Sequence, residues 1–211
     1  AASDVYKRQV LFENFGMMGW KSGNRYTYAE GSPVTNLFMN LKYLIARDNI
    51  YMNTYDLTEV YGVGNVKLLQ NNHYLPMGFM TNSALASWQV DENEDQFNPF
   101  DKQNEFFKLA TGIKNDVYTP LDVVSQGHTD YNQFPVNKTG YGRYSFSCTD
   151  TTVTPHVKWN YEAPKDGLYL MYADISGGDD VTVMINDVAQ SKTYGMGRSY
   201  ICLLYTSPSP R

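Results

Sequence analysis

The spacing of apolar residues predicts a helix over residues 99–111. Asn98 can cap this helix, Pro99 suits its first position, Asp101 complements the helix dipole and Gly112 ends it. The helix has an apolar face that we expect to pack on a sheet: Phe106, Phe107, Leu109 and Ala110. The polar residues are expected to contact solvent: Lys102, Gln103, Glu105 and Lys108.

A short helix and a strand are predicted earlier in the chain. Ser32 is a suitable N-cap and Pro33 a suitable first helical residue for a helix over residues 34–39. Residues 41–45 are rich in β-branched and aromatic side chains and predict a strand.

A β-hairpin is predicted where two apolar runs, 57–61 and 66–69, flank a Gly-Val-Gly-Asn turn at residues 62–65. A Gly-x-Gly loop can also bind phosphate at the start of a helix, but no helical pattern follows this one. The turn is therefore the favoured interpretation.

The pattern changes near residue 115 to short strands separated by Gly, Pro, Asn and Asp, which is typical of antiparallel β-sandwiches. Strands are predicted at 141–148, 153–161, 167–173 and 181–185, and Asn186 with Asp187 forms a turn signal. The predicted fold class is β-rich α+β. A small mixed α/β part over residues 10–115 is followed by an incomplete, jelly-roll-like sandwich over residues 116–201.

The two ends of the chain resemble translated sequencing adapters. Residues 4–9 can be encoded by DNA whose reverse complement encodes residues 202–207, an inverted repeat expected of adapters and not of a gene. We therefore set residues 1–9 and 202–211 aside and expect residues 10–201 to be an internal piece of a longer protein. Cys148 is then the only natural cysteine, and no disulfide is expected.

Composition narrows the classes of function. With 42% hydrophobic and 18% charged residues, the chain can bury a core. Its net charge of −5 and its lack of a basic block make nucleic acid an unfavourable partner. No apolar run reaches the roughly 18 residues of a membrane span.

Metal-binding and catalytic patterns are weak. His73, His128 and His156 lie far apart and have no metal-ligand spacing. The acidic run 91–95 has alternating oxygen ligands and is a weak calcium candidate, through Asp91, Asn93 and Asp95. It lacks the glycine and the glutamate of an EF-hand loop, so a solvated loop is favoured.

Two tryptophans are candidates for contact with sugar. Trp88 and Trp159 could stack on sugar rings, but aromatic residues also fill the cores of small β-sandwiches. Trp159 alternates with Val157 and Tyr161 on a predicted strand, which favours a core position.

Several short segments, in order and with matching spacing, resemble the YfhO family of bacterial membrane proteins. They are residues 40–45, 66–71, 75–79, 98–104 with Thr111 and Gly112, and 160–170. Three pairs fit the family pattern without a known chemical role: Lys42 and Tyr43, Leu75 and Pro76, and Gln103 and Asn104. Met77 stands where the pattern leads us to expect a basic residue.

The resemblance implies a multispanning membrane protein with a GT-C type glycosyltransferase core. Such an enzyme would use a polyprenyl-phosphate-linked sugar to decorate cell-envelope polymers such as lipoteichoic acid. The present segment would lie on the extracytoplasmic side of the bacterial cell membrane, against the membrane-embedded remainder of its own chain, with envelope glycans as further candidate partners. No catalytic residue, metal or cofactor site is carried over to this segment. The alternatives are a carbohydrate-binding β-sandwich module of a bacterial surface protein and a structural domain without a ligand.

Overall fold

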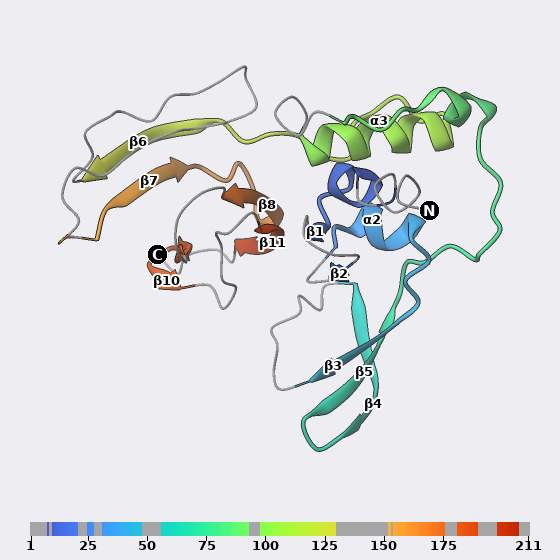
Figure 1. Cartoon of the computed structure of the whole chain (residues 1–211), viewed down its shortest axis with the longest axis horizontal. Helices are drawn as coiled ribbons and strands as arrows, with labels where there is room; N and C mark the ends of the chain where they lie inside the picture. The colour runs from blue at the N-terminus through green and yellow to red at the C-terminus, as the bar shows by residue number, and fades with distance from the viewer. Residues whose placement is uncertain are drawn as a thin grey trace.

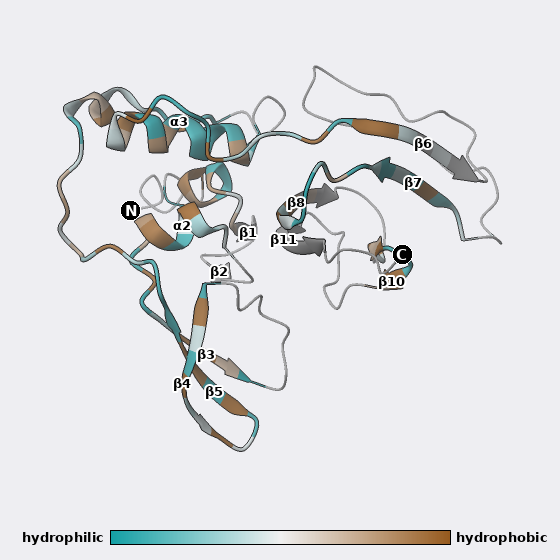
Figure 2. Cartoon of the chain, turned by 180° about the vertical axis from the view of Figure 1, so that it is seen from behind, coloured by the Kyte–Doolittle hydropathy of each residue, from teal (hydrophilic) through white to brown (hydrophobic). Residues whose placement is uncertain are grey.

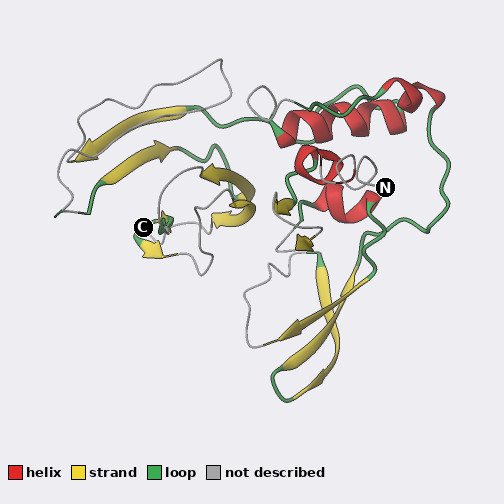
Figure 3. Ribbon diagram, in the orientation of Figure 1, coloured by secondary structure: helices red, strands yellow, loops and turns green. Residues whose placement is uncertain are grey.

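The computed structural model describes residues 8, 10–20, 25–27, 31–47, 56–92, 98–129, 152, 154–175, 181–189 and 198–206. Within these residues, helices and several small antiparallel sheets occur together, which confirms a sheet-rich α+β fold (Figure 1). The helices gather on one side of the molecule, and the strands β6 to β11 lie on the other (Figure 3).

Two predicted helices are confirmed with their caps. Helix α2 spans Pro33–Phe38, and the Ser32 side chain accepts a 3.1 Å hydrogen bond from the Thr35 N–H. Helix α3 spans Pro99–Thr111, and Asn98 accepts from the Phe100 N–H at 2.8 Å. Gly112 ends α3 in the left-handed conformation, with φ of 77°. These local signals act on neighbouring residues, which is why sequence alone located both helices.

The packing partner of α3 differs from the prediction. Its apolar side contacts other helical segments rather than a sheet: the Phe106 ring lies 5.1 Å from Phe15 and 4.8 Å from Phe38, between centroids. Phe15 follows a helical stretch at residues 10–14, which was not predicted from the sequence. A 3₁₀ helix, η1 (Ser83–Ser87), places Trp88 against the same cluster. In the described part of the chain, this aromatic cluster is therefore formed between helical segments.

A three-stranded antiparallel sheet contains the predicted hairpin. Strand β5 (Val66–Asn71) lies between β3 (Tyr43–Arg47) and β4 (Leu57–Val63). Gly64 has φ of 59° in the tight turn between β4 and β5, as the turn prediction required. The register shifts between Glu59 and Tyr61, which marks a bulge in β4. This sheet extends away from the helices (Figure 1).

The remaining strands form antiparallel pairs. Strands β1 (Met18–Trp20) and β2 (Arg25–Thr27) pair, as do β6 (Val123–Thr129) and β7 (His156–Tyr161). Strand β8 (Gly167–Ile175) pairs with β11 (Arg198–Thr206). Strands β9 (Met184–Ile185) and β10 (Val188–Ala189) flank Asn186 and Asp187, whose φ values of 50° and 63° confirm the turn signal.

Parts of the predicted sandwich lie outside the described residues. These include the predicted strand at 141–148 and Cys148. The other predicted strands are confirmed in part, with β7 beginning at His156 and β9 at Met184. Strand β11 continues past Ile201 to Thr206, through residues that resemble a translated adapter. In the part of the chain that the structure describes, no helix has the length and apolar character needed to cross a bilayer.

Candidate functional site

Trp88, the first predicted sugar-contact residue, is packed among aromatic rings. Its ring lies 5.7 Å from Phe15 and 5.3 Å from Phe106, the latter in an edge-to-face arrangement, between centroids. The Trp88 side chain is half-buried, and its buried Nε1 atom has no hydrogen-bond partner among the described residues. These contacts give Trp88 a packing role beside α3.

Trp159, the second candidate, lies in β7 opposite Gln126 of β6. It is half-buried, and so is Val157 on the same strand, whereas Lys158 and Asn160 are exposed. This alternation is that of a strand with one covered face. Trp88 and Trp159 thus belong to separate elements, and contact of either with sugar stays a prediction.

The weak calcium candidate is described only at its first residue. The main chain of Asp91 is held by Asn14, whose side chain accepts from the Asp91 N–H and donates to its carbonyl oxygen, both at 2.8 Å. Asn93 and Asp95 lie outside the described residues. Among the residues that are described, no three His, Cys, Asp or Glu side chains gather as a metal site.

A shallow concavity of about 350 Å³ lies beside α2 and is the first candidate site defined by geometry. Pro33, Val34 and Leu37 form its apolar wall. At its rim, the Nδ1 atom of His73 lies 3.1 Å from an Oδ atom of Asp56. The Asp56 side chain is 18% exposed and that of His73 is 71% exposed. Because the imidazole is mostly in solvent, this hydrogen-bonded pair resembles a surface contact more than a buried catalytic dyad.

A second concavity, of about 370 Å³, lies along α3, and most of the residues that line it have polar or charged side chains. Burial, followed by the nearby charge of Asp116, raises the pKa of Asp101, and Lys108 partly opposes this shift. Lys108 forms an ion pair with Asp116 across the same concavity. Desolvation likewise raises the pKa of Tyr118, whose hydroxyl accepts a 3.3 Å hydrogen bond from the Val34 N–H.

Gln103, one of the residues that carry the family resemblance, is fully buried. The prediction that it contacts solvent is wrong. Its Nε2 atom donates to the Phe15 carbonyl oxygen at 3.1 Å, and its Oε1 atom accepts from the Ser32 hydroxyl. Gln103 lies three, four and seven residues before Phe106, Phe107 and Ala110, so the helical period had already placed it on the apolar side.

Asn104, the next residue, fixes the chain that follows α3. Its Oδ1 atom accepts from the N–H groups of Val117 and Tyr118 at 3.0 and 2.9 Å, and its Nδ2 atom donates to the Tyr118 carbonyl oxygen at 2.8 Å. These three hydrogen bonds all join the Asn104 side chain to main-chain atoms, which is the pattern of a structural asparagine.

Lys42 and Tyr43, a further pair that fits the family pattern, form a cation–π contact. The Lys42 Nζ atom lies 5.3 Å from the centroid of the Tyr43 ring and 5.0 Å from that of Tyr74. Interaction with Tyr74, and then with Tyr43, raises the pKa of Lys42. Met77, at the position where a basic residue was expected, is 92% exposed.

Comparison with known proteins identifies the class of the chain. Its sequence matches, over residues 3–209, the pattern of one family of bacterial membrane proteins. The chain belongs to this family, described as Bacterial membrane protein YfhO. No curated protein and no solved structure matches it.

Proposed function

We propose that this chain is a non-catalytic, extracytoplasmic region of a multispanning membrane glycosyltransferase. The parent enzyme transfers a sugar from a polyprenyl-phosphate donor to a cell-envelope polymer of the lipoteichoic-acid type. The region packs on the membrane-embedded remainder of its own chain and shapes the access of the acceptor. Membership of a bacterial membrane protein family supports the location at a membrane.

The proposal rests on the structural role of two residues that fit the family pattern, Gln103 and Asn104. Gln103 and Asn104 are buried and bonded to the main chain of Phe15, Val117 and Tyr118, so they maintain a fold rather than face a substrate. These two residues that fit the family pattern are in this respect structural, as expected of a scaffold region.

The test is a sugar-transfer assay with the whole membrane protein, including the spans of its parent chain. Membranes that contain it are supplied with a labelled polyprenyl-phosphate sugar, and label in lipoteichoic acid is measured per molecule of enzyme. Replacement of the titratable pair, Asp56→Asn with His73→Gln, is expected to change kcat less than twofold.

Two results would contradict this function. A hundredfold fall in kcat after the Asp56→Asn and His73→Gln changes, at an unchanged protein level, would place catalysis in this region. Absence of sugar transfer by the unmodified protein from any polyprenyl-phosphate donor would remove the glycosyltransferase assignment itself.

A further inference from the structure

One face of the three-stranded sheet is apolar and lies open to solvent. The strand registers align Arg47 with Val66 and Val63, and Ile45 with Leu68 and Tyr61. A third row aligns Tyr43 with Gln70 and Thr58. Side chains of paired residues in neighbouring strands point to the same side, so these rows share one face. We call it the projecting face: Tyr43, Ile45, Arg47, Thr58, Tyr61, Val63, Val66, Leu68 and Gln70.

The exposure of the projecting face is unusually high for apolar residues. Ile45 is 68%, Tyr61 66%, Val63 64% and Tyr43 48% exposed. Hydrophobic segments recur along these strands, which extend away from the helices (Figure 2). Single exposed apolar residues are ordinary on protein surfaces. A contiguous group of them, in contrast, marks a site of interaction with a protein, a membrane or a ligand.

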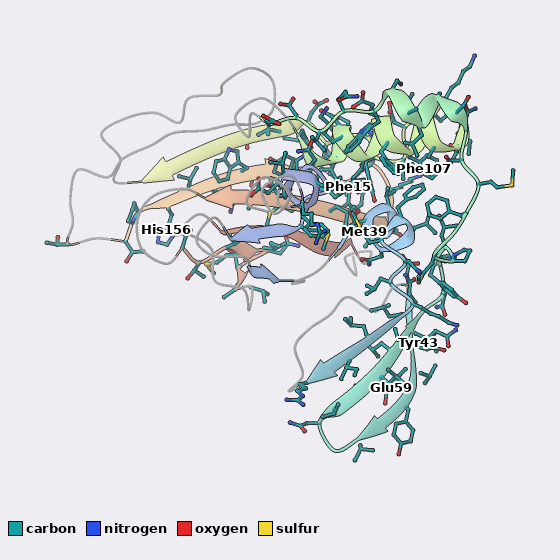
Figure 4. All side chains as sticks on the ribbon, turned by 45° about the vertical axis from the view of Figure 1, so that its right-hand side comes forward. Phe15, Met39, Tyr43, Glu59, Phe107 and His156 are labelled. Carbon is teal, nitrogen blue, oxygen red and sulfur yellow. The ribbon has the colours of Figure 1, made fainter. Side chains whose placement is uncertain are left out.

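The opposite face of the sheet differs in burial and in charge. It carries Leu69, which is 4% exposed, and Asn71, which is 1% exposed. It also carries Glu59, whose carboxylate forms a 2.9 Å ion pair with Lys67. Figure 4 labels Glu59 on β4 and Tyr43 on β3. Glu59 is the only acidic residue of the three strands, so no carboxylate of these strands lies on the projecting face.

Positive charge, in contrast, borders the projecting face. Arg47 lies on it at one end of β3, and at the other end the Lys42 ammonium sits 5.3 Å from the ring centroid of Tyr43. The chain as a whole has a net charge of −5. The strand residues of the projecting face thus combine apolar side chains with a cation, Arg47, and carry no carboxylate. This combination is complementary to a surface whose anionic groups lie above an apolar layer.

We propose that the projecting face binds the surface of a phospholipid bilayer. Ile45, Val63 and Leu68 lie at the boundary of the acyl chains, and Tyr43 and Tyr61 lie at the level of the headgroups, where amphipathic aromatic rings are favoured. Arg47 contacts anionic headgroup phosphate. The proposal depends on the membership of a membrane protein family and not on sugar transfer, so it can fail or hold independently of the function proposed above.

The test is flotation of the whole 211-residue chain with vesicles of equal parts phosphatidylglycerol and phosphatidylcholine. Aggregated protein sinks in the gradient and is not counted as bound. The variant Ile45→Thr with Val63→Thr keeps β-branched residues in the strands and is expected to lower the floated fraction at least fivefold. The matched control is Met77→Thr with Met80→Thr, which removes apolar side chains that are 92% and 101% exposed but lie outside the sheet. The control is expected to float as the unchanged chain does.

Charge and self-association are tested with the same preparations. Arg47→Gln is expected to lower flotation at least threefold with anionic vesicles and less than twofold with pure phosphatidylcholine. No flotation of the unchanged chain, while its circular dichroism shows a folded protein, would overturn the proposal. Equal losses in the sheet variant and the methionine control would overturn it too. A dimer in sedimentation that the Ile45 and Val63 changes convert to a monomer, with flotation unaltered, would assign the face to a second copy of the chain instead.

Discussion

The Gln103 side chain in α3 donates a 3.1 Å hydrogen bond to the carbonyl oxygen of Phe15, 88 residues earlier in the chain. The same amide accepts from Ser32, the N-cap of α2. One side chain therefore connects the start of the chain, α2 and α3. The neighbouring hydroxyl of Thr35 also donates to the Phe15 carbonyl, at 3.1 Å, so the connection is a small buried network.

Replacement of this amide is expected to destabilise the protein. Gln103→Leu removes the donor to Phe15 and the acceptor for Ser32 in a site with 0% exposure, and should lower the free energy of unfolding by about 1–3 kcal/mol. Urea denaturation followed by circular dichroism measures the change. Gln89→Leu, at an exposed position, is the control and should stay within about 0.5 kcal/mol of the unchanged protein. Equal effects of the two changes would contradict a structural network at Gln103.

Replacement of Phe106 in the aromatic cluster is expected to lower the stability of the protein more than replacement of Gln103. Its ring contacts Phe15, Phe38 and Trp88 at centroid distances of 5.1, 4.8 and 5.3 Å. Phe106→Ala should cost about 3–5 kcal/mol, because a cavity opens between the helices. Thermal unfolding measures the loss, and the fluorescence of Trp88 should shift to longer wavelength as water approaches its ring.

Phe79→Ala provides the comparison for Phe106. Phe79 is 36% exposed and contacts Phe38 at 5.7 Å, so its removal should cost less than half as much. If Phe79→Ala proved the more damaging change, the core would not lie between α2, α3 and Trp88.

A side chain at Gly112, where α3 ends, is expected to strain the backbone. With φ of 77°, Gly112 adopts a backbone conformation that residues with a Cβ atom rarely occupy. A Cβ atom at this position would also lie 3.4 Å from the Asn82 Nδ2 atom. Gly112→Ala should therefore lower the free energy of unfolding by about 1–2 kcal/mol in chemical denaturation. Gly78→Ala, where a Cβ would meet nothing within 4 Å, should be neutral or slightly stabilising. A neutral Gly112→Ala variant would show that α3 ends in another way.

Asp101 predicts a dependence of stability on pH. Burial and Asp116 raise its pKa in the folded protein above the ordinary value of 3.8. The folded state thus favours the protonated carboxyl, and this contribution to stability is present at low pH and lost as the pH rises through the raised pKa. The stability of the unchanged protein minus that of Asp101→Asn should fall as the pH rises from below the ordinary pKa of 3.8 through the raised pKa. Urea titrations at each pH measure the difference. A difference that stayed constant or rose would contradict the shift.

The hairpin and the helix caps could be predicted because their signals are local. Gly64 supplies the positive φ of the turn, and Ser32, Asn98 and Gly112 bond or turn the main chain of their immediate neighbours. The prediction that Gln103 contacts solvent was wrong because the contacts of this side chain are not local. Its partners, Phe15 and Ser32, are distant in sequence, and residue polarity alone suggested water where the fold supplies a carbonyl and a hydroxyl.

The candidate site was predictable only in part. Trp88 was recognised as an aromatic residue with two possible roles, and its contacts with Phe15 and Phe106 depend on how η1 and α3 meet. The Asp56 and His73 pair was not predicted, because its members lie 17 positions apart in the sequence, on either side of a hairpin. A register of strands brings them together, and spacing along the chain does not encode that register directly.

The family, the β-rich α+β class and the ends of the principal helices follow from residue order and from main-chain bonds between near neighbours, so the amino-acid sequence is sufficient to assign them. Which face of the three-stranded sheet is covered depends on the packing of distant parts of the chain. Leu69 is buried while Ile45 and Tyr61 are exposed, although all three are apolar residues of the same small sheet. Burial depends on which element packs against a face, and that is a property of the assembled chain.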